Sequence, residues 1–363
     1  MALTPSVKIA VSRFKKSVTE QMAFIMKRNS GFTLVELLVV IAVIGIMMAI
    51  LLPAVQSVRS AARRTSCLNN IRQVALATTM FHDANKAYPP ARIQPAMFPG
   101  AGLGCGGSEP SWLVRIMPYI EANNAYKSWD LAVSFADHPA EVTDVALEIF
   151  CCPTRRVASE AIIDDSTVTT GSTLPCGCGG GQQISVVGGA TGDYAGNHGD
   201  PSPGSAGVES DYWRGGNGTG VIISSRARCF RHPTLPFNPQ VPGRWVDRIG
   251  IKNIKDGTSS TFLMGELHVQ PERLNEMPYN GPIYNGEDVA AFSRIGGPTV
   301  PIAPHPTYEP GPIYGFGSWH PSACNFALAD GSTRTVNNLI DTSTLGQLCH
   351  RADGGSVNLD NNN

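Results

Sequence analysis

His320 is the side chain in this sequence best suited by type to proton-transfer chemistry. It stands ten residues before Asp330-Gly331. With Asp330 or with Glu266, its imidazole would form a base oriented by a carboxylate. No serine elbow, P-loop or H-E-x-x-H accompanies it, and Asp-Gly is itself a strong turn signal. We therefore favour a structural role, in which His320 bonds loop backbone beside a hairpin, and we do not expect an enzyme.

Four aspartates in glycine-rich loops offer the oxygen ligands that calcium prefers, namely Asp193, Asp200, Asp211 and Asp256. Such residues are also ordinary turn formers, and this is the interpretation we favour. No Cys-x-x-Cys occurs, and no pair of histidines has the spacing of zinc ligands. The sequence therefore predicts no metal and no cofactor, with calcium as the alternative.

The cysteines leave their pairing open. Because their number is odd, at least one thiol is left over or pairs between chains. The adjacent Cys151-Cys152 and the close Cys176-Gly-Cys178 are expected to pair with distant partners rather than with each other. Several buried free thiols are the alternative. The nine cysteines are residues 67, 105, 151, 152, 176, 178, 229, 324 and 349.

A carboxylate near the start of a long apolar run is the other unusual feature. After Glu36 no charged residue appears until Arg59, so the twenty-two residues 37–58 are uncharged. This meets the ~20 residues that a membrane-spanning helix needs. An acid in hydrocarbon costs on the order of 2–3 kcal/mol, so Glu36 should have a partner. The alternative is a signal anchor with Glu36 at the level of the lipid headgroups.

The elements that position these residues begin with one long helix. Beyond the apolar run, apolar residues recur every three or four positions, which predicts a helix that ends at Tyr88-Pro89-Pro90. Its predicted inner face comprises Val55, Val58, Ala62, Leu68, Ile71, Val74 or Ala75, Thr78 and Phe81.

Two β-hairpins are predicted around Asp-Gly pairs. Each pair is expected to form a type I′ turn, which requires positive φ at both central residues. The first hairpin joins 248–254 to 261–266 through Asp256-Gly257, and the second joins 324–329 to 332–336 through Asp330-Gly331.

The start of the apolar run resembles the leader junction of type IV prepilins and type II secretion pseudopilins. The residues are Gly31-Phe32-Thr33-Leu34-Val35-Glu36, which follow a basic pair. The resemblance implies that a prepilin peptidase cleaves after Gly31 and methylates the amine of Phe32. It also implies that Glu36 pairs with the terminal amine of a neighbouring subunit during assembly.

A second resemblance covers most of the chain. His320 and Asp330-Gly331 form an H-x9-D-G pattern, similar to the carboxy-terminal, processing-associated signature of a large bacterial family of prepilin-like proteins of uncharacterised function. Cys152-Pro153-Thr154 departs from that family's usual Cys-Pro-Ser. The other matching segments are Cys67-Leu68-Asn69-Asn70, Phe81-His82-Asp83, Tyr88-Pro89-Pro90, Ser111-Trp112-Leu113, residues 193–197, residues 256–261 and Gly265-Glu266.

Composition fits an exported β-rich head. Without residues 1–31 the net charge is about −6, which argues against a nucleic-acid partner. Only 16% of residues are charged, and 38 Gly and 27 Pro indicate a loop-rich fold. We expect an α+β, pilin-like fold, in which the long helix packs on a large, loop-rich antiparallel β head. The predicted regions are a cleaved leader (1–31), a transmembrane helix (32–58), its amphipathic continuation (59–88) and the head (89–363).

The predicted function is a pseudopilin-like or minor-pilin-like structural subunit of a type II secretion or type IV pilus-like system. Its expected partners are the prepilin peptidase, other pilin-like subunits, the inner-membrane assembly platform and the membrane. We expect a single-pass protein of the inner membrane, with its head in the periplasm or at the cell surface. The alternative is a membrane-anchored envelope protein whose head binds an extracellular ligand and which uses the pilin-type start only for export.

Overall fold

The computed structural model describes residues 33–94, 110–131, 133–169, 183–202, 216–226, 245–309, 314–355 and 357. The predicted leader, the Gly31-Phe32 junction and Asp211 lie outside these described residues. The chain divides into two compact units, residues 1–59 and residues 60–363. Each unit is described by itself.

The longest element is the helix α2 (Leu34–Asn85), which contributes to both units. In the first unit its apolar side chains between Leu34 and Val58 are exposed. At 1.5 Å per residue this part extends roughly 37 Å, more than the ~30 Å hydrocarbon core of a bilayer. It is long and apolar enough to cross a membrane. The helix runs on through Pro53, although proline lacks the N–H that would bond one turn back.

In the second unit, α2 buries one face in the head. The predicted positions Ile71, Val74, Ala75, Thr78 and Phe81 are all buried, which confirms the helical spacing. Of the other predicted positions, Leu68 is only partly buried, with Cys67 buried in its place, and Ala62 is exposed. Val55 and Val58 belong to the first unit and are also exposed. The helix ends at Asn85, three residues before the predicted end. Lys86 follows with φ of 57°, a left-handed conformation that commonly ends a helix.

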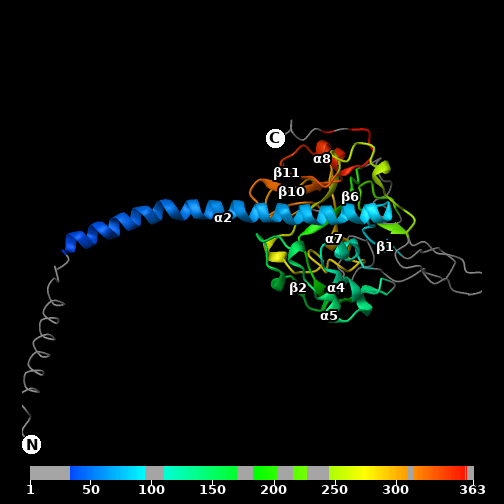
Figure 1. Ribbon diagram of the computed structural model, residues 1–363, viewed down its shortest axis with the longest axis horizontal. Helices are drawn as coiled ribbons and strands as arrows, with labels where there is room; N and C mark the ends of the chain where they lie inside the picture. Colours follow the sequence, from blue (N-terminus) through cyan, green and yellow to red (C-terminus); the bar gives the residue numbers. More distant parts are fainter. Residues whose placement is uncertain are drawn as a thin grey trace, which may run out of the picture. The chain divides into compact units, whose positions relative to one another are not determined.

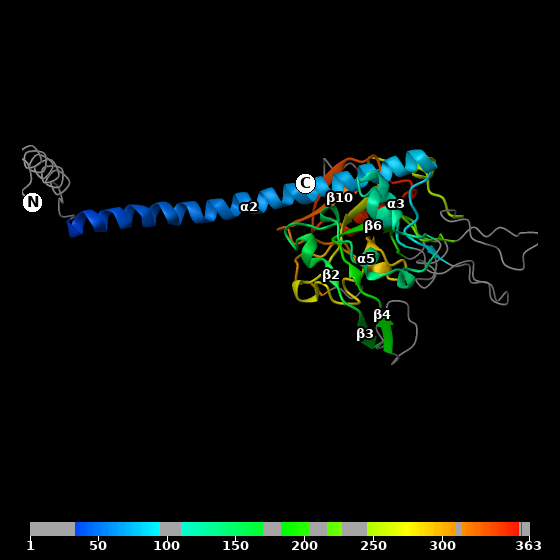
Figure 2. The same ribbon diagram turned by 60° about the horizontal axis from the view of Figure 1, so that its bottom comes forward.

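A five-stranded sheet forms the centre of the head. Its order is β11-β10-β8-β6-β9. The pairs are antiparallel except for β6 and β9, which are parallel. In Figures 1 and 2, the part of α2 within the head runs beside β6 and β10. The strands are β6 (Tyr194–Gly199), β8 (Phe262–Glu266), β9 (Ser293–Ile295), β10 (Ala323–Leu328) and β11 (Thr333–Asn337).

Short elements connect and cover this sheet. Three two-stranded pairs are β1 (Ile93–Gln94) with β7 (Ser225–Arg226), β2 (Ile162–Ile163) with β5 (Gly189–Ala190), and β3 (Ser166–Thr169) with β4 (Gln183–Val186). The short helices are α3 (Trp112–Ile116), α4 (Asn123–Lys127), α5 (Ala140–Thr143), α7 (Val289–Phe292) and α8 (Thr342–Cys349). Single 3-10 turns lie at 117–119, 135–137, 148–150, 158–160, 251–253 and 271–273.

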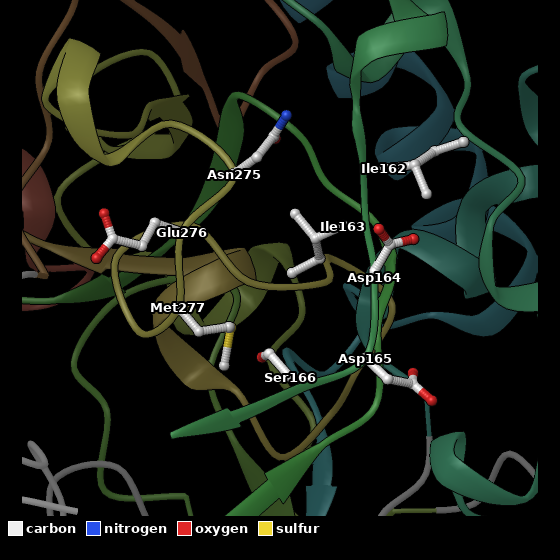
Figure 3. Close-up of a pocket in the computed structure, with 8 residues that line it drawn as sticks. All are labelled: Ile162, Ile163, Asp164, Asp165, Ser166, Asn275, Glu276 and Met277. Carbon is white, nitrogen blue, oxygen red and sulfur yellow. The ribbon is translucent and has the colours of Figure 1, made fainter. Parts of the chain in front are cut away.

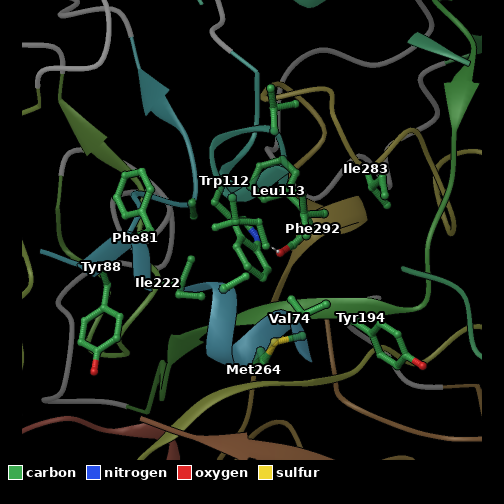
Figure 4. Packing of buried hydrophobic residues seen from close by; sticks show 14 of the residues in the cluster. Val74, Phe81, Tyr88, Trp112, Leu113, Tyr194, Ile222, Met264, Ile283 and Phe292 are labelled. Atoms are coloured by element: carbon green, nitrogen blue, oxygen red, sulfur yellow. Dashed lines mark hydrogen bonds between the residues drawn. The ribbon is translucent and has the colours of Figure 1, made fainter. Parts of the chain in front are cut away.

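The main core lies between the sheet, α2 and the short helices. Trp112 of α3 is fully buried, and its indole N–H donates to the carbonyl oxygen of Phe292, 3.0 Å away. Val74 of α2 and Met264 of β8 belong to the same cluster, and Figure 4 shows their side chains gathered around the indole. Because these residues come from distant parts of the chain, the core fixes α2 against the sheet within the head.

The second predicted hairpin is confirmed, although its turn differs. β10 and β11 pair antiparallel, with Ala327 opposite Thr333. The N–H of Gly331 donates to the Leu328 carbonyl oxygen, and that of Leu328 to the Ser332 carbonyl oxygen. Only Gly331, at φ of 83°, has positive φ in the turn. This is a three-residue loop ending in a left-handed glycine, not the expected type I′ turn.

The first predicted hairpin is wrong. Residues 251–253 form a 3-10 turn, and β8 pairs with β6 and β10 rather than with the segment before Asp256-Gly257. The carbonyl oxygen of Ile249 instead accepts a hydrogen bond from the Tyr88 N–H, 2.7 Å away. The strand-like segment therefore bonds to the chain just after α2 and not to a strand of the sheet.

Candidate sites in the helix start and the buried head

The first candidate site is the beginning of α2. The Glu36 carboxylate accepts hydrogen bonds from the Thr33 backbone N–H at 2.9 Å and from its hydroxyl at 2.8 Å. In return, the Glu36 N–H donates to the Thr33 hydroxyl at 3.2 Å. This is a capping box, in which a threonine and the glutamate three residues later satisfy each other's backbone donors. Glu36 therefore has a partner within its own chain.

The second candidate site is buried in the head and is formed by Cys67, Cys152, Glu266 and His320; we call it the Cys–Glu–His cluster. Cys67 comes from α2, Cys152 follows the 3-10 turn at 148–150, Glu266 ends β8 and His320 precedes β10. Cys67 and Cys152 form a disulfide between residues 85 positions apart. All four residues are at most 2% exposed.

Glu266 and His320 face the disulfide. His320 Nε2 lies 3.3 Å from Glu266 Oε1 and 3.6 Å from Cys152 Sγ. The same Glu266 oxygen lies 3.7 Å from Cys152 Sγ, and its other oxygen accepts from the Asn325 N–H at 2.8 Å. Because this pair is buried, a substrate would reach it only if the head opened.

A buried ionic network adjoins the cluster. The fully buried Asp193 carboxylate forms ion pairs with Arg156 at 2.6 Å and with Arg155 at 3.4 Å. It also accepts a hydrogen bond from the Cys152 N–H at 2.7 Å. Arg155 also donates to the carbonyl oxygens of Leu267 and Gly317. Buried charges are tolerated when they are paired and their remaining donors are bonded. The network therefore orders the backbone on both sides of the cluster.

The carboxamide side chains extend this network. Arg156 also donates to the side-chain oxygens of Asn275 and Asn280 and to the carbonyl oxygen of Gly192. Sequence reasoning missed Arg155 and Arg156. Two adjacent arginines shortly after a Cys-Pro pair were the available signal.

Comparison with known families decides the membership of the chain. Residues 56–343 match a family model described as "Protein of unknown function (DUF1559)". The chain belongs to this family. No solved structure gives a significant match.

The amino-terminal part of this DUF1559 protein has a second match. Residues 26–52 match the model of the prokaryotic N-terminal methylation motif. Over 63 residues the chain is 38% identical to type II secretion system core protein G of Pseudomonas aeruginosa. That alignment covers 17% of this chain and 44% of the relative, so the chain spans less than half the length of that protein.

The segments that carried the second resemblance meet in the core of the DUF1559 head. The Cys67, Cys152, Gly265-Glu266 and His320 segments form the Cys–Glu–His cluster, and the segment at 193–197 borders it. The Tyr194 hydroxyl lies 3.4 Å from the carbonyl oxygens of Cys67 and Cys151. Burial, followed by the nearby Glu266 charge, raises the pKa of Tyr194 well above its usual range, so its phenol stays neutral.

The structure corrects the expected surroundings of His320. Its imidazole faces the Glu266 carboxylate and the disulfide rather than loop backbone. Asp330 instead lies in the turn, where its carboxylate accepts from the Ser332 N–H at 2.8 Å. Of the two oriented-base arrangements considered from sequence, the geometry therefore matches Glu266 and not Asp330.

The calcium candidates have other partners where the structure describes them. Asp193 belongs to the arginine network, and Asp200 accepts from Ser202. Asp256 accepts from the N–H groups of Asp353 and Gly354, each at 2.8 Å. Asp211 lies outside the described residues. These three carboxylates are therefore used by the local fold. The predicted absence of a cofactor and its alternative, calcium binding, are both untested.

Three buried thiols are free in the described part of the chain, namely Cys151, Cys324 and Cys349. Burial raises the pKa of Cys151 to about 12 and those of the other two well above their usual range. Thiols in this state are poor nucleophiles. Both expectations from sequence hold for different cysteines: Cys152 pairs with a distant partner, and its neighbour Cys151 is a buried free thiol.

A pocket of about 500 Å³ opens elsewhere in the head. Residues 162–166 and 275–277 line it, and Figure 3 shows Asp164, Asp165 and Glu276 among its side chains. Glu276 pairs with Arg273 at 2.6 Å, and Asp165 accepts from the Gly188 N–H at 2.8 Å. These two acids are committed to local structure, so we place the candidate sites elsewhere.

Proposed function

We propose that this protein is a pseudopilin-like or minor-pilin-like structural subunit. The observation that carries this proposal is the methylation motif at residues 26–52, placed at the start of an apolar helix. The local likeness to a type II secretion core protein supports the same role. A prepilin peptidase would cleave between Gly31 and Phe32 and methylate Phe32. A type II secretion or type IV pilus-like platform in the inner membrane would then assemble the mature subunits.

Assembly in this proposal depends on Glu36. Its carboxylate caps the first turn of α2 through Thr33, so it is held near the new amino terminus that cleavage would create. A carboxylate has lone pairs to accept from a further donor, such as the methylated amine of a neighbouring subunit. The exposed apolar side chains between Leu34 and Val58 would pack against lipid or the helices of neighbours.

The proposed location is the inner membrane, with a single span and the head in the periplasm or at the cell surface. The Cys67–Cys152 disulfide supports a head outside the cytoplasm, because disulfides persist in oxidising compartments. We propose no catalytic role for the head. The burial of Glu266 and His320 supports this for the pair best suited to proton transfer.

Processing is tested by mass spectrometry of the amino terminus in membranes that contain an active prepilin peptidase. The wild-type chain should begin at methylated Phe32, and Gly31→Val should retain its leader, because the prepilin resemblance places the cut directly after this glycine. Ser30→Val is the matched control, with the same added side chain one residue away, and should be processed. An intact leader on the wild-type protein would overturn the proposal.

The second candidate function is a membrane-anchored envelope protein whose head binds an extracellular ligand. The capping box favours it, because Thr33 already satisfies the Glu36 carboxylate without a neighbouring subunit. Purification of the tagged full chain from membranes separates the two candidates. Co-purification with other pilin-like subunits supports the structural subunit, whereas recovery as a monomer supports the anchored protein.

A further inference from the structure

The Cys–Glu–His cluster combines four groups that commonly bind metals. One ligand atom from each of Cys67, Cys152, Glu266 and His320 lies within 4.8 Å of all the others. The proposed assembly role uses none of these side chains. What they do is therefore a question separate from the function of α2.

A disulfide alone does not account for this environment. A disulfide is uncharged and gains little from a carboxylate beside it, whereas a buried carboxylate needs compensating contacts. Glu266 is fully buried and directs one oxygen toward both Cys152 and His320. The carboxylate, the imidazole and the two sulfurs are therefore close enough for one ion to contact all four.

The separations among His320, Glu266 and Cys152 fit three corners of a tetrahedral zinc centre. Usual zinc bonds to sulfur, nitrogen and oxygen place tetrahedral ligands about 3.3 Å apart for nitrogen and oxygen, and about 3.5 Å apart for sulfur with either. The observed separations are 3.3 Å from His320 to Glu266, 3.6 Å from His320 to Cys152, and 3.7 Å from Glu266 to Cys152. The Cys67 sulfur lies within 4.8 Å of the other three ligand atoms and is bonded to the Cys152 sulfur, so the two sulfurs must move apart for both to bind one ion.

We propose that the dithiol form of this cluster binds one zinc ion through Cys67, Cys152, Glu266 and His320. Thiol–disulfide exchange with a dithiol produces this form. The reductant gives two electrons and two protons to the cysteine sulfurs and leaves as its own disulfide. Zinc binding then releases both thiol protons. The disulfide and the zinc site are mutually exclusive states of the same residues, selected by the redox state of the cysteines.

Charges near the cluster are compatible with this centre. Two thiolates, one carboxylate and Zn²⁺ together carry a charge of −1, with His320 neutral. Arg155 and Arg156 share the single carboxylate of Asp193 and leave one excess positive charge nearby. The Cys152 N–H is held by Asp193 at 2.7 Å, which fixes the backbone of one ligand. Such outer contacts orient metal ligands.

The test uses the full chain in detergent, with Cys105, Cys176, Cys178 and Cys229 changed to serine so that thiols outside the described residues do not bind metal. The protein is reduced with a dithiol under anaerobic conditions, freed of reductant and titrated with Zn²⁺. Co²⁺ is used in parallel, because cobalt bound to thiolates shows charge-transfer bands. We expect one equivalent of Zn²⁺ on the reduced protein and none on the oxidised protein.

Variants assign the ligands. His320→Leu and Glu266→Gln should each weaken zinc binding by more than about tenfold, the lower limit seen when even outer contacts are lost. His320→Cys supplies another zinc ligand and should restore binding, which distinguishes ligation from a packing defect. Cys349→Ala removes a buried thiol outside the cluster and should leave the stoichiometry unchanged. Equal zinc binding by oxidised and reduced protein, or binding that persists in His320→Leu and Glu266→Gln, would overturn the proposal.

Discussion

Asp288 is the residue whose titration should contribute most clearly to the pH dependence of stability. One oxygen of its carboxyl is buried and has no hydrogen-bond partner among the described residues. Burial raises the pKa of Asp288 from 3.8 to about 7, although the Arg294 charge opposes the shift. Between about pH 4 and 7, the folded chain holds a proton that the unfolded chain releases. Stability therefore falls as pH rises through this window, and the loss is complete above pH 7.

Asp288→Asn should remove this slope. Between pH 5 and 8, the wild-type chain should lose roughly 2–3 kcal/mol more unfolding free energy than the variant. Asp341→Asn is the matched control: Asp341 is exposed, and hydrogen bonds from Ser343 and Thr344 lower its pKa, so its carboxyl is ionised at both pH values. Urea unfolding of the full chain in detergent at the two pH values provides the measurement. Equal losses in wild type and Asp288→Asn would show that the Asp288 carboxyl is not protonated in the folded chain at pH 5.

At this residue scale, sequence reasoning identified single positions better than it identified their partners. It identified Glu266 and His320, and it expected a distant partner for Cys152. The partner itself, Cys67, is 85 residues away, and no local pattern encodes a contact at that separation. Asp330 and Glu266 were both candidate partners of His320, and the sequence did not decide between them, since only the pairing of β8 with β10 brings Glu266 close.

At the scale of elements, the β10–β11 hairpin depends on one glycine. Gly331 has φ of 83°, and the nearest atom to an added Cβ is 3.7 Å away, so backbone strain rather than collision limits substitution. Gly331→Val should destabilise the head by more than ~1 kcal/mol, because a β-branched residue fits the left-handed region poorly. Ser332→Val, which adds the same side chain one position later without positive φ, should cost less. Thermal unfolding of the full chain decides between them, and equal midpoints for wild type and Gly331→Val would show that the turn tolerates the strain.

Elements with local patterns were predicted better than those defined by distant pairing. The inner face of α2 follows the three-to-four spacing because a helix satisfies its backbone within itself. The segment 248–254 alternates like a strand, but its backbone bonds go to Tyr88 and to its own 3-10 turn. Strand identity needs partner strands, and those of β8 are β6, far before it in the chain, and β10, far after it.

At the scale of the whole molecule, the Cys67–Cys152 disulfide should be a large contribution to the stability of the head. It closes a loop across 85 positions, and a disulfide typically stabilises a fold by about 2–4 kcal/mol, more for longer loops. The double variant Cys67→Ala/Cys152→Ala should have an unfolding free energy lower by about that amount when the full chain is unfolded in the presence of a metal chelator. A reductant should lower the midpoint of the wild type and leave that of the double variant unchanged. Equal responses to reductant would show that the bond does not hold the head.

At the scale of the whole molecule, the sequence-based predictions of fold and family that rested on long family motifs are confirmed. The long helix, the β-rich head and the membership of the DUF1559 family agree with the sequence-based expectations. The parallel β6–β9 pair and the buried ionic network around Asp193 were not predicted, because both depend on how the long connections fold back onto the sheet. The partner of Glu36 decides between an assembling subunit and an anchored protein. Within the chain that partner is Thr33, and in an assembly it would be the amine of a neighbouring subunit.

The most direct test of the central claim is crosslinking in membranes through cysteines introduced at Val39 and Ile46, compared in three backgrounds. Thr33→Val removes the side-chain cap but keeps the carboxylate. Glu36→Ala removes both the cap and the partner for a neighbouring amine. Chains without the introduced cysteines control for native thiols. As an assembling subunit, the protein should give ladders of crosslinked chains in wild type and in Thr33→Val, and none in Glu36→Ala, with membrane insertion intact in all three. Equal ladders in all three backgrounds, or no ladder in any, would contradict assembly through Glu36.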